Sequence, residues 1–175
     1  MYLEGQLSYS RLLADNHQID GLLLYNMRDY VNADAASAIY SLPYRTQGIA
    51  ARLSYSYKGR YFIEGNFGYN GSENFSKGNK WGFFPSVAGG WLVTNEKFME
   101  NALSVLSKLK FRGSYGLVGN DQLAGRRFAF LSTINSGNGF TYGLTGNQGI
   151  GGKFEGDFGV EDLSWETVKK TDIGV

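Results

Sequence analysis

The side chains that most often carry covalent or acid–base chemistry are scarce in this sequence. His17 is the only histidine among 175 residues, and there is no cysteine. The missing cysteines exclude a thiol nucleophile, a zinc ribbon and a disulfide scaffold. One histidine near a turn excludes a multi-histidine metal site and predicts a solvated ring. Neighbouring carboxylates such as Glu161 and Asp162 lack the spacing of a general acid and base, so the sequence predicts no enzyme and no cofactor.

A phosphate site or a nucleic-acid partner is not indicated either. The glycine-rich stretch 146–152 precedes Lys153, but a phosphate-binding loop needs glycine where Asn147 stands and serine or threonine where Phe154 stands. Lysine and arginine number 17 against 16 aspartate and glutamate, a net charge of +1 without a basic run. Nucleic-acid backbones are bound by concentrated positive charge, so we expect no nucleic-acid partner.

Alternation of apolar and polar residues dominates the chain and is typical of β-strands, whose successive side chains point to opposite faces. Five stretches alternate clearly: 2–10, 49–57, 61–70, 83–93 and 109–117. A sixth, 19–28, is less regular because Leu22, Leu23 and Leu24 are consecutive. Two weaker ones lie around 127–134 and 169–175. Apolar residues between 98 and 106 recur at helical spacing, which predicts one short helix near 95–107 with Thr94 or Asn95 as its N-cap.

The turn at 58–60, Lys-Gly-Arg, determines how the strands on either side of it pair. Matching their apolar faces places Tyr57 opposite Tyr61, Leu53 opposite Gly65 and Arg52 opposite Asn66. A shift of one residue would mix the two faces. The alternation therefore specifies the register of this hairpin.

Strand length and the chemistry of the two faces favour a membrane barrel. The clear runs are about 9–11 residues long, the length that crosses a bilayer at a tilt. We expect the polar side to line a hydrated lumen with Arg52, Glu64, Asn66, Lys110 and Arg112. Rings near the run ends are expected to form an aromatic girdle at the membrane interfaces: Tyr9, Tyr57, Tyr61, Tyr69, Trp91 and Tyr115. The predicted fold class is all-β, an antiparallel up-and-down transmembrane β-barrel segment of about seven or eight strands.

Several segments, in order along the chain, carry a family resemblance. They are Arg52–Tyr61, Asn70–Ser72, Trp81–Trp91, Glu96–Phe98, Leu109–Gly116, Gly119–Asn120, Trp165–Glu166 and Lys170–Gly174. Together they resemble the barrel of SusC/RagA-type TonB-dependent outer-membrane transporters, over roughly residues 45–175. Residues 1–44 fit the preceding strands by pattern alone.

The resemblance implies that residues 1–175 form a partial barrel domain, a C-terminal-half fragment of a barrel of about 22 strands. We expect the family's plug domain, its TonB-engaging segment, a signal peptide and a terminal aromatic residue to be absent. Such barrels lie in the outer membrane of Gram-negative bacteria, surrounded by outer-membrane lipid. They pair with a SusD-like lipoprotein, and the TonB complex displaces their plug. The implied function is import of a large nutrient, an oligosaccharide or a peptide.

Binding is expected in the two long loops, 29–48 and 135–165, which are rich in glycine, asparagine, serine and tyrosine. Five loop aromatics are expected to stack on the substrate's sugar rings: Tyr30, Tyr40, Tyr44, Phe140 and Tyr142. The alternative for each ring is local packing or a place at a strand end.

Two other interpretations stay open. A complete eight-stranded outer-membrane barrel with an adhesin or structural role would pair its first strand with its last. A soluble β-sheet binding module would cover its apolar side with a second protein layer, and its tyrosines would be ordinary strand formers.

Overall fold

Strands account for most of the structure, a computed structural model that describes residues 1–32, 38–102, 106–122, 126–144, 146 and 148–175. The strands are β1 (Tyr2–Leu13), β2 (His17–Tyr30), β3 (Tyr44–Tyr57), β4 (Tyr61–Ser72), β5 (Trp81–Leu92), β6 (Lys110–Asn120), β7 (Ile134–Tyr142), β8 (Gln148–Glu155) and β9 (Glu166–Gly174). One α-helical turn, α1 (Ala38–Ser41), and two 3-10 turns, η1 (Val93–Asn95) and η2 (Lys97–Ala102), complete the elements. No helix of the described residues has the length and apolar character needed to span a membrane.

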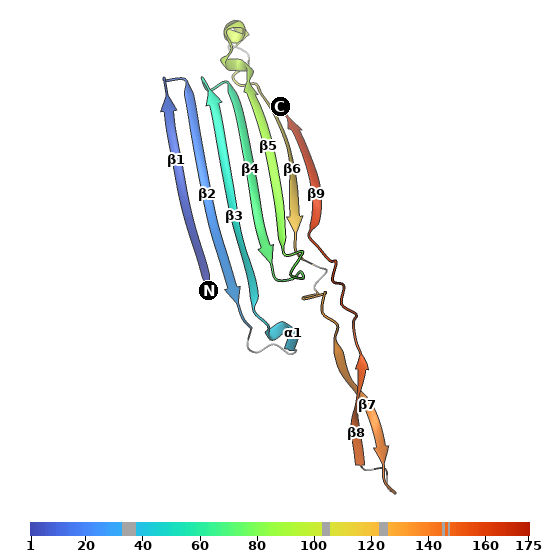
Figure 1. Cartoon of the computed structure of the whole chain (residues 1–175). Coiled ribbons are helices and arrows are strands. Elements are labelled where there is room, and N and C mark those ends of the chain that lie inside the picture. The colour runs from blue at the N-terminus through green and yellow to red at the C-terminus, as the bar shows by residue number, and fades with distance from the viewer. Residues whose placement is uncertain (33–37, 103–105, 123–125, 145, 147) are drawn as a thin grey trace.

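Seven strands form one antiparallel sheet in the order β1-β2-β3-β4-β5-β6-β9 (Figure 1). The chain leaves this sheet between β6 and β9. There, β7 and β8 pair with each other and project beyond the sheet as a separate hairpin (Figure 1). Within the described ranges the edge strands β1 and β9 do not pair with each other, so the sheet shows no closure into a small barrel.

The register between β3 and β4 is the predicted one. It places Tyr57 opposite Tyr61, Leu53 opposite Gly65 and Arg52 opposite Asn66. The same alternation continues in phase through all the remaining strand pairs of the sheet. Side chains of one kind therefore gather on one side across all seven strands.

We call the two sides the apolar face, which carries Leu53, Ile63, Phe67 and Phe111, and the polar face, opposite to it. The four apolar side chains are 62%, 56%, 40% and 44% exposed. No second layer of described residues covers them. A soluble sheet would bury such a face, because each large side chain gains about 1.5–3 kcal/mol from burial. An exposed apolar surface of this extent indicates a lipid or protein environment.

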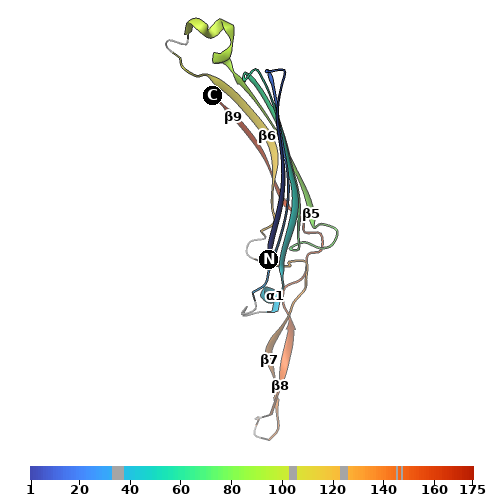
Figure 2. The same ribbon diagram turned by 90° about the vertical axis from the view of Figure 1, so that its left-hand side faces the viewer.

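The two ends of the sheet differ in their connections. The short-turn end has the turns at 14–16 and 58–60 and the segment 93–109 with η1 and η2. The long-loop end has the segments 31–43, 73–80 and 121–165. Figure 2 shows η1 and η2 at one end of the curved strands and the β7–β8 hairpin at the other. At the tight turn Lys58 and Gly59 both have left-handed backbones, with φ of 52° and 62°, as the two central residues of a type I′ turn do.

The helix expected near 95–107 is replaced by the 3-10 turns η1 and η2, and 103–105 lie outside the described residues. The expected cap side chains have other partners. The hydroxyl of Thr94 accepts a hydrogen bond from the amide of Leu109 at 3.4 Å, and the Asn95 amide donates to the carbonyl of Gly59 at 3.2 Å. Contacts with the ends of neighbouring strands thus override the local helical pattern.

The weak strand expected around 127–134 is also different in the structure. Residues 126–133 form turns, and the strand β7 begins only at Ile134. The expected long loop 135–165 contains the β7–β8 hairpin instead, whose connection uses Gly143 and Gly146 at φ of 96° and 61°. Glycine adopts these angles at no steric cost, so the stretch can reverse direction.

Candidate binding surfaces on the polar face and among the long loops

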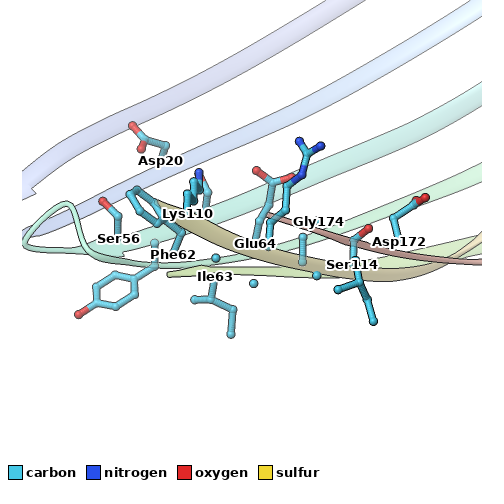
Figure 3. A pocket seen from close by; sticks show the side chains of 17 residues that line it. Asp20, Ser56, Phe62, Ile63, Glu64, Lys110, Ser114, Asp172 and Gly174 are labelled. Carbon is cyan, nitrogen blue, oxygen red and sulfur yellow. The ribbon is translucent and has the colours of Figure 1, made fainter. Parts of the chain in front are cut away.

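A hollow of about 710 Å³ lies on the polar face toward the short-turn end (Figure 3). Its charged walls come from β2, β4, β6 and β9: Asp20, Glu64, Lys110, Arg112 and Asp172. Figure 3 shows Asp20, Glu64 and Lys110 extending to one side of the sheet and Ile63 to the other. The period-two alternation of the strands therefore separates this charged hollow from the apolar face.

Side-chain contacts hold several of these groups in place. Asp20 accepts hydrogen bonds from Ser10 at 2.6 Å and Gln18 at 2.8 Å, and Glu64 accepts one from Asn66 at 2.9 Å. The Lys110 ammonium lies 4.5 Å from the centre of the Phe62 ring, within cation–π distance. Charges of both signs line the hollow, which suits a hydrated polar solute better than an ion of one sign.

All five predicted lumen residues lie on the polar face. The hollow brings Glu64, Lys110 and Arg112 together, whereas Arg52 and Asn66 lie outside its lining, opposite each other on β3 and β4. Asp20 and Asp172 also line it, although the sequence pattern does not place them on this face. Both belong to runs in which the alternation is blurred, so their face was not evident from sequence.

Three of the predicted girdle residues form one cross-strand row at the short-turn end: Tyr57, Tyr61 and Trp91. The rings of Tyr61 and Trp91 stack with centroids 6.4 Å apart at 10°. Tyr69 lies near the long-loop end and stacks on Trp81 at 4.8 Å and 10°. The apolar face thus has a stacked tyrosine–tryptophan pair near each end.

Tyr9 and Tyr115 lie further inside the sheet, on one cross-strand row that passes through Leu53 and Val87 and continues to Thr171 on β9. Strands in a barrel tilt by about 35–45° from its axis. In a barrel, residues far apart on one cross-strand row therefore lie at different heights along the axis.

Glu96 anchors the short-turn end. Its carboxylate accepts a hydrogen bond from the Trp91 indole at 3.2 Å and forms an ion pair with Arg60, also at 3.2 Å. Hydrogen bonds from Tyr61, then from Trp91, and the nearby Arg60 hold the pKa of Glu96 below its ordinary value. Only 13% of the Glu96 side chain is exposed. Through its contacts with Arg60 and Trp91, the carboxylate connects the segment after β5 to the start of β4.

The five predicted loop aromatics form two separate groups. Tyr30 and Tyr44 are register partners at the ends of β2 and β3, and Tyr40 lies on α1 between these strands in sequence. Phe140 and Tyr142 lie on the projecting hairpin and are 72% and 46% exposed. The structure therefore does not bring all five rings to one platform.

Arg127 connects two of the long loops and was not singled out from the sequence. Its side chain is 7% exposed, and its guanidinium donates to the carbonyls of Leu42 and Pro43, each at 3.1 Å, and of Ile39 at 3.4 Å. It also lies 3.7 Å from the centre of the Tyr44 ring. The planar guanidinium can donate several hydrogen bonds at once, which suits this multiple contact. The only sequence signal for such a role is the pair Arg126 and Arg127 in a weakly alternating stretch.

A small aromatic core lies at the same end. Phe75 is fully buried, and the centroid of its ring lies 5.4 Å from that of Trp165. Trp165 in turn packs edge-on against Phe84, with ring centroids 5.1 Å apart. The Trp165 indole donates to the carbonyl of Lys80 at 3.1 Å. The loop between β4 and β5 is thus packed against the segment just before β9.

Hydrogen bonds extend this loop packing to the segment after β6. Asp121 accepts a bond from Ser72 at 2.7 Å, and its carbonyl accepts one from Asn74 at 3.1 Å. The carbonyl of Glu161 accepts a bond from Ser76 at 2.8 Å. The long-loop end is a connected assembly built on the sheet.

Sequence comparison finds TonB-dependent receptors. TonB-dependent receptor P3 of Formosa agariphila is 33% identical over 127 residues, 73% of this chain and 12% of the relative. TonB-dependent receptor P39 of the same organism is 25% identical over 98% of this chain and 18% of the relative. TonB-dependent receptor SusC of Bacteroides thetaiotaomicron is 42% identical over 80 residues, 46% of this chain and 8% of the relative. No family model matches the chain.

The fold is similar to solved importer structures. The RagAB peptide transporter superimposes with a TM-score of 0.77 at 19% identity, over 98% of this chain and 21% of the other. The RagAB peptide importer in its open-open state gives 0.73 at 19% identity, over 99% of this chain and 20% of the other. The chain thus spans about a fifth of these structures and less than a fifth of the curated relatives described above.

Proposed function

We propose that this chain, a SusC/RagA-type segment of a TonB-dependent receptor, forms part of the barrel wall of an outer-membrane nutrient importer in a Gram-negative bacterium. The observation that carries the proposal is the seven-stranded sheet with one exposed apolar face and one charged face. Outer-membrane barrels present an apolar band to lipid and a polar interior to water. The apolar face would contact outer-membrane lipid, with the tyrosine–tryptophan pairs in the girdle.

In this proposal the polar face is the wall of the transport path. Arg52, Glu64, Asn66, Lys110 and Arg112 face the lumen and contact its water or the passing substrate. The substrate is a large polar nutrient, an oligosaccharide or a peptide, and charges of both signs in the hollow support a hydrated solute. Tyr30, Tyr40, Phe140 and Tyr142 are the proposed stacking rings, while Tyr44 already contacts Arg127.

The long-loop end is proposed to face the cell exterior, because outer-membrane barrels have long extracellular loops and short periplasmic turns. A SusD-like lipoprotein would cover this end. The projecting hairpin supports that role with an exposed row of Phe140, Ile150 and Phe154, which are 72%, 63% and 54% exposed. Contact with the TonB complex would occur outside this segment.

Charge reversal on the polar face of the whole receptor tests the transport role. A double variant, Lys110→Glu with Arg112→Glu, should lower uptake of the nutrient that the wild-type receptor imports, with unchanged receptor content in the outer membrane. Lys97→Glu is the matched control, because Lys97 is exposed on η2, away from the hollow. Growth on single oligosaccharides or peptides, with and without TonB, provides the measurement.

Unchanged growth after removal of the receptor, or of TonB, would contradict the importer proposal. A small closed barrel would require pairing between β1 and β9, and a soluble module would require a covered apolar face. Recovery of the receptor in the soluble fraction would favour the soluble module.

A further inference from the structure

A second hollow, of about 270 Å³, lies at the long-loop end of β2 to β5. Gln47, Gly71 and Trp81 belong to one cross-strand row of the apolar face, and Asp29 pairs with Arg45 one row further out. The hollow therefore opens on the outer side of the sheet, just beyond the aromatic girdle, and not on the polar face. Its volume is near the lower end of the roughly 300–1,000 Å³ of small-molecule sites.

Trp81 supplies a flat wall that is held in place. One face of its indole stacks on Tyr69 at 4.8 Å and 10°. A Cβ at Gly71 would lie 3.0 to 3.1 Å from three of its ring atoms, so only glycine lets the indole lie across this position unhindered. The ring is 44% exposed. Its N–H has no acceptor among the described residues, whereas the N–H of Trp91 at the opposite end donates to Glu96.

Charged groups of both signs line the same hollow as the indole. Arg45 pairs with Asp29 at 3.1 Å, and Lys80 lies 4.0 Å from Glu73. The four side chains are between 34% and 55% exposed, so their remaining donors and acceptors can reach a ligand. An unaccompanied anion would meet both carboxylates and a cation would meet both basic groups. The arrangement favours a neutral ligand with several hydroxyl groups.

We propose that this hollow binds a single sugar ring. The C–H face of the sugar lies on the exposed face of Trp81, where the negative π-face attracts weakly positive hydrogens. Hydroxyls donate to Asp29 and Glu73 and accept from Arg45, Lys80 and the indole N–H, which gives charge-assisted hydrogen bonds. The sugar has two sources: the headgroup of a membrane glycolipid, whose acyl chains would follow the apolar face, or a free glycan.

This site is separate from the proposed transport path, because it opens on the other side of the wall. Sugar binding in this hollow therefore does not depend on whether the receptor imports a nutrient.

Fluorine NMR on the whole receptor, labelled with fluorotryptophan in phosphatidylcholine nanodiscs, tests the proposal at the site itself. The Trp81 resonance is assigned by its loss in Trp81→Phe, and the Trp91 resonance, assigned in the same way, serves as the internal control. One arm adds rough-type lipopolysaccharide to the nanodiscs, and the other adds methyl glucoside, methyl galactoside or N-acetylglucosamine. Arg45→Gln provides a variant that leaves the indole in place.

We expect the Trp81 resonance to shift in at least one arm while that of Trp91 stays. Arg45→Gln should weaken the apparent affinity about tenfold, through loss of a charge-assisted bond. A shift with lipopolysaccharide alone identifies the glycolipid headgroup, and a shift with soluble glycosides identifies a free glycan. The proposal is overturned if neither probe moves Trp81, if Trp91 moves equally, or if Arg45→Gln binds as the wild type does.

Discussion

The guanidinium of Arg127 lies 3.7 Å from the centre of the Tyr44 ring, although 83 positions separate the two residues in the sequence. The same guanidinium donates to the backbone carbonyls of Leu42 and Pro43. The segment after β6 is thereby joined to the segment before β3. Tyr44 is occupied by this contact, and its ring acts in loop packing.

Substitution of Arg127 should loosen the segment 38–43. Hydrogen bonds to charged groups are worth about 1.5–3 kcal/mol each, so a net loss equal to one of the Arg127 bonds in Arg127→Ala should lower the free energy of local opening by about 2 kcal/mol. This corresponds to roughly thirtyfold faster cleavage by a protease that attacks the open form. Arg127→Lys should be intermediate, because it keeps the charge and loses the planar fork.

Arg126 offers the matched control for that experiment. It is part-exposed, and its guanidinium contacts the carbonyl of Phe158 and the carboxylate of Asp157. Arg126→Gln should leave the segment 38–43 as protected as in the wild type. Equal cleavage of wild type and Arg127→Ala would show that the arginine does not hold this loop.

Phe75 should be the most sensitive position of the loop core. Its side chain is fully buried against Trp165, and replacing a buried phenylalanine by alanine costs about 3–5 kcal/mol. Phe75→Ala should expose the Trp165 indole and red-shift its fluorescence. Phe98→Ala, at a residue that is 67% exposed, should change stability by no more than about 0.5 kcal/mol. Similar effects of both substitutions would contradict a packed core at the long-loop end.

Acid should weaken the anchor at the short-turn end through Glu96. The folded pKa of Glu96 is lowered, mainly by hydrogen bonds from Tyr61 and Trp91. A carboxyl with a lowered folded pKa adds stability above its unfolded value of about 4.3 and loses it as the pH falls through the folded value. Trp91 fluorescence should therefore be constant near neutral pH and change in the acid range below about pH 4. In Glu96→Gln this acid-range change should disappear; its persistence would assign it to another group.

The hairpin at 58–60 shows what the sequence alone determined well. Alternation predicted its register, because a one-residue slip would place Leu53 opposite Glu64, and the structure pairs the two strands as expected. The pattern was weaker where apolar residues are consecutive, as at Leu22, Leu23 and Leu24. There the face of Asp20 was missed.

The contacts among the long loops could not be predicted from the sequence, because they join residues far apart in the chain. Arg127, Phe75 and Trp165 owe their environment to Pro43, Trp165 and Phe84, which are 84, 90 and 81 positions away, respectively. No periodicity in the sequence marks contacts of this kind, because they depend on which loops the sheet places next to each other. The same applies to Thr94 and Asn95, whose side chains contact Leu109 and Gly59 in place of capping a helix.

Charge placed on the two faces should have opposite consequences. Leu53→Arg puts a guanidinium on the apolar face, which costs about 2–4 kcal/mol at the middle of a bilayer. Ser54→Arg, one residue along β3, puts the same group on the polar face, opposite Glu64, where it should be tolerated. Heat resistance of the folded receptor on gel electrophoresis compares the two variants. Equal stability would contradict a lipid-facing apolar side.

Site-directed spin labelling along β3 tests most directly what covers the apolar face. The 175-residue chain has no cysteine, so single cysteines at Ala51, Arg52, Leu53, Ser54 and Tyr55 can carry the label in a cysteine-free receptor. In bilayers we expect high accessibility to oxygen at 51, 53 and 55 and to a water-soluble nickel chelate at 52 and 54, alternating with a period of two. Labels at 51, 53 and 55 that neither reagent reaches, or that the nickel chelate reaches best, would show that protein or water covers this face and would contradict the account.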